Sequence, residues 1–387
     1  MGGDTKYIYI VNVTRQLSID MINCFNKQGA GIHLITGSQE VNYAPLDKEV
    51  KVTRLIKYNN TSAFKRIFTW AIFTIHSFFY VLFAGRKKEL IIITSPPFIV
   101  FTGWFFKMIR GQKYHLIIWD LYPDVLVNFG VLKETSLITK AWKKMNKKCF
   151  DKATSIFTIG IHLSDAIKKY TTCEPQIIQN WANTDFIKPL PRSENPFAKK
   201  YQLENKLVVM YSGNMGMTHD IESIVNTAEI LKDNSQIQFL IIGEGAKKAK
   251  ISRIIEEKKL KNILLLPYQE KEMLPFSLTA ADIGIVTLSE GAESVSVPSK
   301  TYYTLASGAA ILALASIESE LALLIKKYNC GIIFDKPDHK AIADFILSQV
   351  ADKASLENFK KNSRQASLDF TPKNAELFYK AIVTENR

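Results

Sequence analysis

Residues 207–220 read LVVMYSGNMGMTHD, and this stretch decides the fold. A run of apolar residues ends at Gly213, a second glycine follows at Gly216, and an amphipathic stretch begins at Asp220. A short strand that enters a helix through a glycine turn is typical of the parallel βα unit. Glycine lets the backbone approach a phosphate at such a turn, where amide N–H groups and the helix dipole supply positive potential. We therefore predict a phosphate-binding turn at residues 213–216, with a tight structural turn as the alternative.

The same alternation of apolar strands and amphipathic helices extends in both directions from this stretch. Downstream, strands are predicted at 207–212, 237–242, 263–266, 283–286, 310–315 and 331–334, and upstream at 7–11, 31–36, 90–94, 115–119, 155–158 and 176–178. Between the two series lies a linker rich in proline and polar residues, at 189–196. The length of 387 residues suits two domains of similar size.

These patterns predict an α/β fold with two Rossmann-like, doubly wound domains that face each other across a cleft. We expect an N-terminal domain at residues 1–188, a C-terminal domain at 189–368, and a helix at 369–387 that packs back on the first domain. Ligands of such sheets bind beyond the carboxyl ends of the strands, so the active site is expected in the cleft.

Two further turns of the second domain have the residues of an anion site. Gly243 and Gly245 follow a strand and resemble a nucleotide-supporting loop, although a structural turn fits equally well. The stretch 288–300 leads through Pro298 into a helix that begins near Ser299 and Lys300. Their amides and side chains are expected to meet an anion at the helix end, while Glu290 or Glu293 accepts hydrogen bonds from sugar hydroxyls. The alternative is a solvated loop with an ordinary cap.

In the first domain, acidic side chains follow the strand predicted at 115–119. Asp120 stands at its carboxyl end, where it could orient a sugar or assist proton transfer. Asp120 and Asp124 could equally be a helix cap and a surface charge. His162, after the strand at 155–158, could reach the cleft, but a lone histidine is more often structural.

The four cysteines are scattered and form no metal-binding pattern. We expect reduced thiols in a cytoplasmic chain, and no zinc site. The start of the chain also lacks the basic-then-apolar layout of a signal peptide.

The positive charge is concentrated in one region. Residues 51–150 contain 17 Lys/Arg and 4 Asp/Glu, and aromatic residues are dense there. Basic residues mixed with aromatics suit an anionic membrane surface or lipid pyrophosphate groups, and no nucleic-acid-binding motif accompanies the charge. The uncharged stretch 67–85 is about as long as a marginal membrane span, but a span would separate strands that share one sheet. We expect an interfacial helix, with a buried helix or a span as alternatives.

Three motifs together resemble the family 4 glycosyltransferases of the GT-B fold, particularly those of capsule, O-antigen and colanic acid synthesis. They are residues 178–183 with Phe186 and Pro189, residues 211–216 with His219, and residues 296–300 with 305–308. The resemblance covers nearly the whole chain. It implies a UDP-sugar donor bound by the C-terminal domain, an acceptor bound by the N-terminal domain, and retention at the anomeric carbon without a metal or other cofactor.

The sequence departs from the general family pattern at several positions. Asn214 and His219 occupy the positions of an arginine and a lysine, Tyr303 replaces the second of two glutamates, and Glu293 or Glu290 corresponds to the first. The glycine pair after the first strand is replaced by residues 12–15. Lys300, Ser299 and backbone amides are then expected to compensate the negative charge of the diphosphate. The expected catalytic residues are Asp120, Lys300 and Glu293, and the expected donor-binding residues are Gly213, Asn214, Gly216, His219, Gly243, Gly245, Tyr268, Ser296, Ser299 and Tyr303.

The sequence therefore predicts a retaining glycosyltransferase at the inner face of a bacterial membrane. It would move a sugar from UDP to a lipid-linked saccharide, with a polyprenyl pyrophosphate carrier, during surface polysaccharide synthesis. The expected partners are a nucleotide-sugar donor, this acceptor and an anionic membrane surface, and not nucleic acid. Two alternatives remain: a UDP-sugar epimerase of the same fold, and a catalytically inactive membrane-associated assembly partner.

Overall fold

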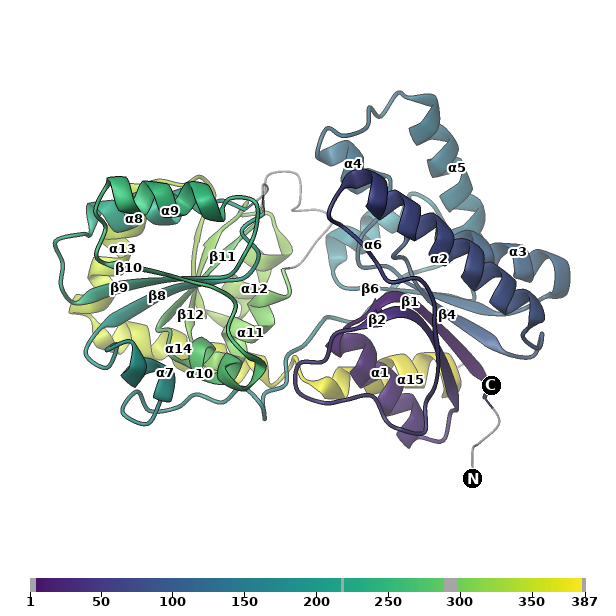
Figure 1. Cartoon of the computed structure of the whole chain (residues 1–387), viewed down its shortest axis with the longest axis horizontal. Helices are drawn as coiled ribbons and strands as arrows, with labels where there is room; N and C mark the ends of the chain where they lie inside the picture. Colours follow the sequence, from purple (N-terminus) through teal and green to yellow (C-terminus); the bar gives the residue numbers. More distant parts are fainter. Residues whose placement is uncertain (1–4, 217–218, 289–297, 385–387) are drawn as a thin grey trace. The chain divides into compact units, whose positions relative to one another are not determined.

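The computed structural model describes residues 5–216, 219–288 and 298–384. The chain divides into two compact units (Figure 1). The first contains Met1–Gln179 and Pro372–Arg387, and the second contains Asn180–Glu293 and Val297–Thr371. Each unit is built around one parallel sheet, which confirms the predicted α/β class with two Rossmann-like folds.

The first unit has a seven-stranded sheet in the order β3-β2-β1-β4-β5-β6-β7. Its strands are β1 (Tyr7–Thr14), β2 (Ile32–Gln39), β3 (Lys51–Arg54), β4 (Glu89–Ile93), β5 (Tyr114–Ile117), β6 (Ser155–Thr158) and β7 (Gln176–Ile177). The strand pairs are all parallel, and the central strands are buried on both faces, as their continuous apolar runs require. The sequence missed β3, because this short edge strand is half polar and does not alternate clearly.

Helices cover both faces of this sheet. They are α1 (Gln16–Lys27), α2 (Ala63–Phe83), α3 (Val100–Arg110), α4 (Asp124–Asn128), α5 (Leu137–Asp151), α6 (Ile161–Lys168) and α15 (Ala375–Tyr379). In Figure 1, α1 and α15 lie on one face and α2 and α3 on the other. Phe378 of α15 packs against Phe157 of β6, with ring centroids 5.1 Å apart, so the chain end belongs to the core of the first unit.

The second unit has a six-stranded parallel sheet in the order β10-β9-β8-β11-β12-β13. Its strands are β8 (Leu207–Ser212), β9 (Ile237–Ile242), β10 (Ile263–Leu266), β11 (Ile283–Thr287), β12 (Ala310–Leu314) and β13 (Gly331–Phe334). The principal helices are α7 (Pro196–Lys200), α8 (Glu222–Ile230), α9 (Lys248–Glu257), α10 (Leu274–Thr279), α11 (Lys300–Ser307), α12 (Glu320–Tyr328), α13 (His339–Ala351) and α14 (Lys353–Ser367). One apolar core joins the strands to α8, α9 and α13.

The order of strands puts β8 beside both β9 and β11 at the centre of this sheet. The turns that follow β8 and β9 and the loop that follows β11 therefore leave the same edge of the sheet. Gly213, Gly243 and the approach to Lys300 all come from these segments. The topology thus brings together three turns that are up to 87 residues apart in sequence.

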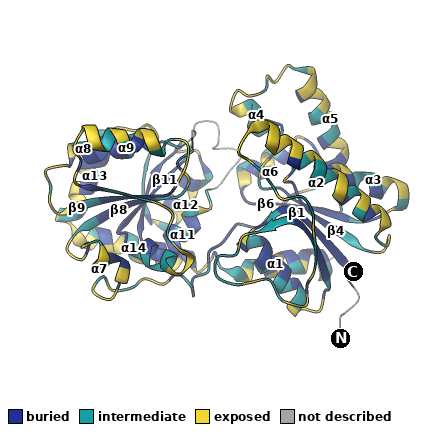
Figure 2. Ribbon diagram, in the orientation of Figure 1, coloured by how far each residue is buried: buried dark blue, intermediate teal, exposed yellow. Residues whose placement is uncertain are grey.

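Helix α2 is unusual because its outward face is more apolar than its inward face. The inward residues include Thr69 and Ser77 beside Phe73 and Val81. The outward residues, which Figure 2 shows as exposed along the helix, include Phe64, Ile67, Phe68, Ile75, Phe79, Leu82 and Phe83. We call these seven residues the α2 stripe. Within the described residues, α2 is the one helix whose length and composition would allow it to cross a membrane.

Candidate functional site

The turns after β8 and β9 interlock through their backbones. The amide of Gly213 donates to the carbonyl of Ile242 at 2.9 Å, and the amide of Met215 donates to that of Glu244 at 2.8 Å. The amide of Lys247 then donates back to the carbonyl of Met215 at 3.0 Å. The two turns therefore form one surface, which we call the glycine platform (residues 213–216 and 243–245).

Three glycines of the platform are required by conformation as well as by space. Gly213, Gly243 and Gly245 have φ of +150°, +151° and +150°, which side chains with a Cβ rarely adopt. A Cβ on Gly243 would lie 1.9 Å from the carbonyl oxygen of Gly213, and one on Gly245 would lie 2.5 Å from the backbone of Met215. Gly216 is less constrained, because a Cβ there would chiefly meet the movable side-chain amide of Asn214.

Lys300 brings an uncompensated cation to the platform. It is the first residue of α11, and its Nζ lies 4.1 Å from the centre of the Tyr211 ring. A Cβ on Gly213 would be 3.3 Å from this Nζ, so the glycine leaves room for the ammonium. The Nζ is buried and has no hydrogen-bond partner among the described residues. Burial lowers the pKa of Lys300 to about 7.

Tyr211 is a site residue that the sequence did not reveal. Its ring lies under the Lys300 ammonium, and its hydroxyl donates to the carbonyl oxygen of Asn214 at 2.6 Å. The residue therefore links the cation to the backbone of the platform. In the sequence, a tyrosine near the end of a buried strand is expected to belong to the core. Its role at the site follows only from its contact with Lys300 in the structure.

His219 lies beside the same platform. Its Nδ1 is buried without a hydrogen-bond partner among the described residues. Burial, and then the charges of Lys300 and Lys247, lower the pKa of His219 to about 4. His219 is therefore neutral near pH 7 and supplies no charge where the family pattern has a lysine.

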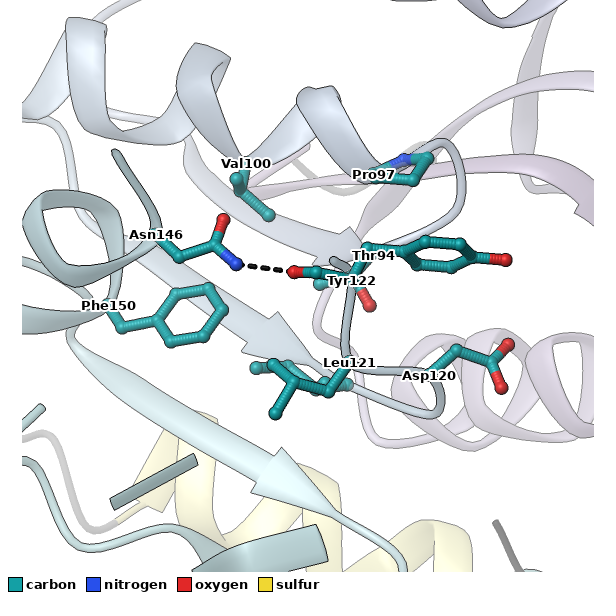
Figure 3. A pocket seen from close by; sticks show the side chains of 9 residues that line it. Thr94, Pro97, Val100, Asp120, Leu121, Tyr122, Asn146 and Phe150 are labelled. Atoms are coloured by element: carbon teal, nitrogen blue, oxygen red, sulfur yellow. Dashed lines mark hydrogen bonds between the residues drawn. The ribbon is translucent and has the colours of Figure 1, made fainter. Parts of the chain in front are cut away.

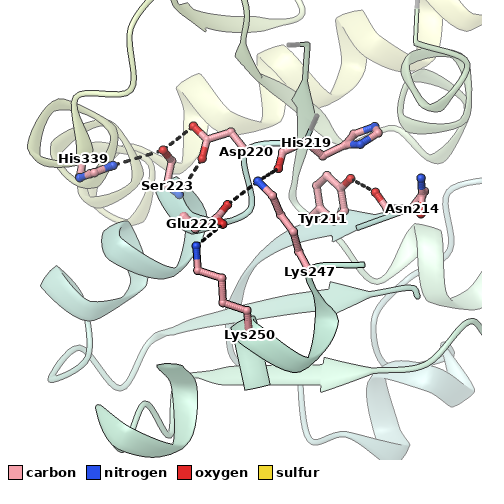
Figure 4. A network of polar contacts seen from close by, with 9 residues as sticks. All are labelled: Tyr211, Asn214, His219, Asp220, Glu222, Ser223, Lys247, Lys250 and His339. Atoms are coloured by element: carbon pink, nitrogen blue, oxygen red, sulfur yellow. Dashed lines mark hydrogen bonds and ion pairs between the residues drawn. The ribbon is translucent and has the colours of Figure 1, made fainter. Parts of the chain in front are cut away.

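Lys247 holds the chain around His219 in place (Figure 4). Its Nζ donates to the carbonyl oxygen of His219 at 2.7 Å and to the carboxylate of Glu222 at 2.8 Å, while Lys250 contacts the other oxygen of that carboxylate. Burial opposes ionisation of Glu222, but the two lysines outweigh it and lower its pKa to about 2. The positive charge of Lys247 is thus already compensated, whereas that of Lys300 is not.

The remaining predicted donor-binding residues of the second unit differ in burial, and one of them lies outside the described residues. Ser299 is exposed at the start of α11 and makes no side-chain cap there. Tyr303 is half-buried on α11, and Tyr268 is exposed just after β10. Ser296, Glu293 and the alternative Glu290 lie outside the described residues. The structure therefore joins Gly213, Asn214, Gly216, His219, Gly243, Gly245 and Lys300 in one site.

Asp120 belongs to the first unit. It follows β5 and lines a small pocket with Thr94, Tyr122 and Asn146, and Figure 3 shows its carboxylate directed away from Asn146. Its carboxylate makes no ion pair or hydrogen bond with the described residues. Although Asp120 is exposed to solvent, desolvation by the surrounding protein raises the pKa of its carboxyl group.

Asp124 and His162 have other surroundings. Asp124 begins α4, accepts a hydrogen bond from Tyr170 at 2.5 Å and lies 3.5 Å from the Lys143 ammonium. Asp124 is therefore not the helix cap that the sequence offered as one interpretation, because Pro123 is the N-cap residue of α4 and no side chain caps the helix. His162 lies in the first turn of α6. Of the acidic pair, only Asp120 keeps a carboxylate that is available to a substrate.

Comparison with known proteins shows similarity to glycosyltransferases. Residues 193–366 match the family described as "Glycosyl transferases group 1". The chain is 29% identical over 269 residues to WbjE of Pseudomonas aeruginosa, whose name describes a glycosyltransferase, and this match covers 68% of the chain and 66% of WbjE. It is 26% identical over 285 residues to WcaI of Escherichia coli (strain K12), whose name describes a glycosyl transferase of colanic acid biosynthesis, and this match covers 69% of the chain and 67% of WcaI.

The chain spans about two thirds of the length of the curated relatives it matches. Among solved structures, it is similar to HepE of Anabaena in complex with UDP and glucose, with a TM-score of 0.73 and 10% identity. That match covers 98% of this chain and all of HepE. At this identity the likeness shows a shared fold.

Gly243 tests the interlocked platform. We expect Gly243→Ala to destabilise the protein by about 2 kcal/mol or more, because the Cβ overlaps a backbone oxygen that cannot move alone. Urea unfolding followed by circular dichroism measures this change. Gly29→Ala is the matched control, since Gly29 has a φ of +74° with open space around it and should cost about 1 kcal/mol. Equal losses in the two variants would contradict the close approach of the two turns.

Proposed function

Given that this chain belongs to the group 1 (family 4) glycosyltransferases with the GT-B fold, a retaining family, we propose that it moves a sugar from a UDP-sugar to a lipid-linked saccharide. The acceptor is a saccharide on a polyprenyl pyrophosphate carrier, and the product belongs to a bacterial surface polysaccharide. The observation that carries the proposal is the buried Lys300 ammonium beside the glycine platform, for which the described residues supply no hydrogen-bond or ion-pair partner.

The donor is bound by the second unit in this proposal. Its diphosphate lies on the glycine platform, where backbone amides and the start of α11 favour an anion. The uracil lies near the exposed ring of Tyr268. No metal is needed, because Lys300 provides the charge that compensates the diphosphate.

The reaction breaks the bond between the anomeric carbon and the β-phosphate oxygen. An acceptor hydroxyl forms the new bond on the same face, and its proton passes to the departing phosphate. Negative charge grows on that phosphate in the transition state, so a cation held ready beside it lowers the barrier. Asp120 orients a sugar of the donor or acceptor through hydrogen bonds.

The deciding experiment offers UDP-, GDP- and TDP-sugars to the protein together with extracted lipid-linked saccharides. We propose that a UDP-sugar alone gives no new sugar, and that transfer requires the acceptor. Conversion of the UDP-sugar without an acceptor would identify an epimerase. Donor binding without transfer to any acceptor would identify an inactive assembly partner.

Replacing Lys300 tests its role at the phosphate. We expect Lys300→Met to lower kcat by about 10²–10³-fold, the range found when one such donor is removed from a transition-state oxyanion. Protein stability should stay unchanged or rise, since an ionised lysine buried without a partner destabilises the fold. Lys271→Met, at an exposed position of the same unit, is the control. Near-normal turnover in Lys300→Met would remove this residue from the site.

The pH dependence of UDP binding gives a second test. The free protein holds Lys300 with a pKa of about 7, and a bound diphosphate favours the charged form. UDP affinity should therefore be greatest below pH 7 and fall by up to about tenfold per pH unit above it. Calorimetric titration between about pH 7 and 9 measures this slope. Lys300→Arg stays charged and should give a flat profile, and an equally flat wild-type profile would contradict the assignment.

The membrane is proposed as the place of the reaction. The α2 stripe presents apolar side chains along the whole helix, with Lys65 and Arg66 near one end and Arg86, Lys87 and Lys88 beyond the other. The opposite face of α2 is buried on the protein from Thr69 to Val81. A helix held along its length by the protein can lie in the interface, but it cannot cross the bilayer without leaving its sheet. The enzyme is thus proposed to sit on the cytoplasmic face of the membrane.

Charges placed in the α2 stripe test this surface. We expect Phe68→Glu combined with Phe79→Glu to reduce binding to anionic vesicles at least tenfold, because each carboxylate would enter an apolar layer. Vesicle sedimentation measures the bound fraction, and UDP affinity should remain unchanged. Ile230→Glu with Ile317→Glu makes the same change on exposed residues of the second unit and should bind like wild type. Equal binding by both double variants would contradict this surface.

A further inference from the structure

An open groove lies beside the C-terminal half of α2. We call it the α2 groove, and it is lined by Leu55, His76, Phe79, Tyr80, Phe83, Ala84, Gly85 and Lys88. Its volume is about 540 Å³, which is large enough for part of an amphiphile. Its lining residues come from the end of α2, the turn before β4 and the residue after β3.

The apolar wall of the groove is continuous with the α2 stripe. Phe79 and Phe83 belong to both, and they are 52% and 85% exposed. An acyl chain that leaves the apolar layer beneath the stripe therefore meets no polar barrier before the groove.

The opposite wall is preformed by polar contacts. The Tyr80 hydroxyl lies 2.9 Å from Nδ1 of His33, and Nε2 of His33 lies 2.8 Å from the hydroxyl of Thr53 on β3. Burial, and then the charges of Lys51 and Lys88, lower the pKa of His33 to about 4. Neutral His33 thus fixes the Tyr80 ring at neutral pH, and two lysines stand close to it.

Lys88 lines the groove, and it ends a run of three basic residues that no acid compensates among the described residues. Arg86, Lys87 and Lys88 are consecutive, and the described residues offer none of them an ion pair. The nearest acid in sequence, Glu89, is already bound to His115 at 2.9 Å and lies 3.6 Å from Lys113. Basic side chains on an edge strand such as β3 can protect the sheet from pairing with another strand. Residues 86–88 have no such role, because they lie in the turn between α2 and β4.

We propose that the α2 groove binds one anionic membrane phospholipid, with an acyl chain against Phe79 and Phe83 and the headgroup phosphate at Lys88 and its basic neighbours. The proposal deepens the membrane contact of the proposed function and rests on it for the source of the lipid. It assigns a separate site rather than the acceptor site. Lys88 precedes the amino end of β4, whereas Asp120 follows the carboxyl end of β5, so the two lie at opposite ends of the sheet.

Filling the groove with one side chain tests the proposal. Native mass spectrometry of the full chain in detergent, with short-chain phosphatidylglycerol added, counts the bound lipids. We expect a saturable adduct of one lipid per chain in wild type, and at least a tenfold loss in Ala84→Trp, because the indole occupies the groove. Ala71→Trp is the matched control, since it adds the same bulk to the exposed side of α2 outside the groove, and it should retain the adduct.

The lipid headgroup and donor binding complete the test. Phosphatidylcholine should give at most a tenth of the phosphatidylglycerol adduct, and Lys88→Gln should reduce the difference. Equal adducts with both lipids, retention in Ala84→Trp, or displacement by a polyprenyl phosphate alone would overturn the proposal. UDP affinity is measured in parallel. If wild type and Ala84→Trp bind UDP equally, loss of the adduct concerns the groove, whereas absence of UDP binding in wild type would refute the proposed function instead.

Discussion

The candidate site depends on one ammonium group that is kept out of water and meets no anion among the residues that the structure describes. Lys300 is held over the Tyr211 ring and against the space left by Gly213. Burying a charge in this way is unfavourable for folding, and its depressed pKa records the penalty. The interlocked backbones of the glycine platform maintain the arrangement. A protein can retain such a group where a ligand supplies the missing negative charge, which is the logic of electrostatic preorganisation.

The two lysines near the platform have different roles: Lys247 is held in ion-pair and hydrogen-bond contacts within the protein, whereas Lys300 is proposed to meet a ligand. Lys247 is fully engaged by Glu222 and the carbonyl of His219, and His219 itself is neutral. These groups shape the turn but leave no free charge. The substitutions at Asn214 and His219 therefore move the cationic role from the turn after β8 to the start of α11. In the proposed function, the anion site therefore keeps its place at the glycine platform, and its charge comes from Lys300 of α11.

Much of this fold could be predicted from the sequence, and particular residues explain where prediction ended. Strands such as Ile237–Ile242 and Gly331–Phe334 were predicted to the residue, because each is a short, mainly apolar run that ends at a glycine or an acidic residue. The edge strand β3 was missed because Lys51–Arg54 is half charged. The platform glycines and Lys300 could be proposed as site residues from local sequence patterns. Tyr211 and Lys247 could not be proposed in this way. Their roles depend on contacts over 89 and 28 residues of sequence.

The outward apolar face of α2 has a consequence for the chain when it is free in solution. Two copies could cover these faces by meeting each other, because exposed aromatic patches favour self-association. The surrounding region, residues 51–150, has an excess of 13 basic over acidic residues (17 against 4), so approaching copies repel one another through basic side chains. Repulsion of this kind weakens as ionic strength rises, whereas apolar attraction does not. Colloidal behaviour is therefore governed by salt: dilute buffer keeps the chains apart, and concentrated salt brings them together.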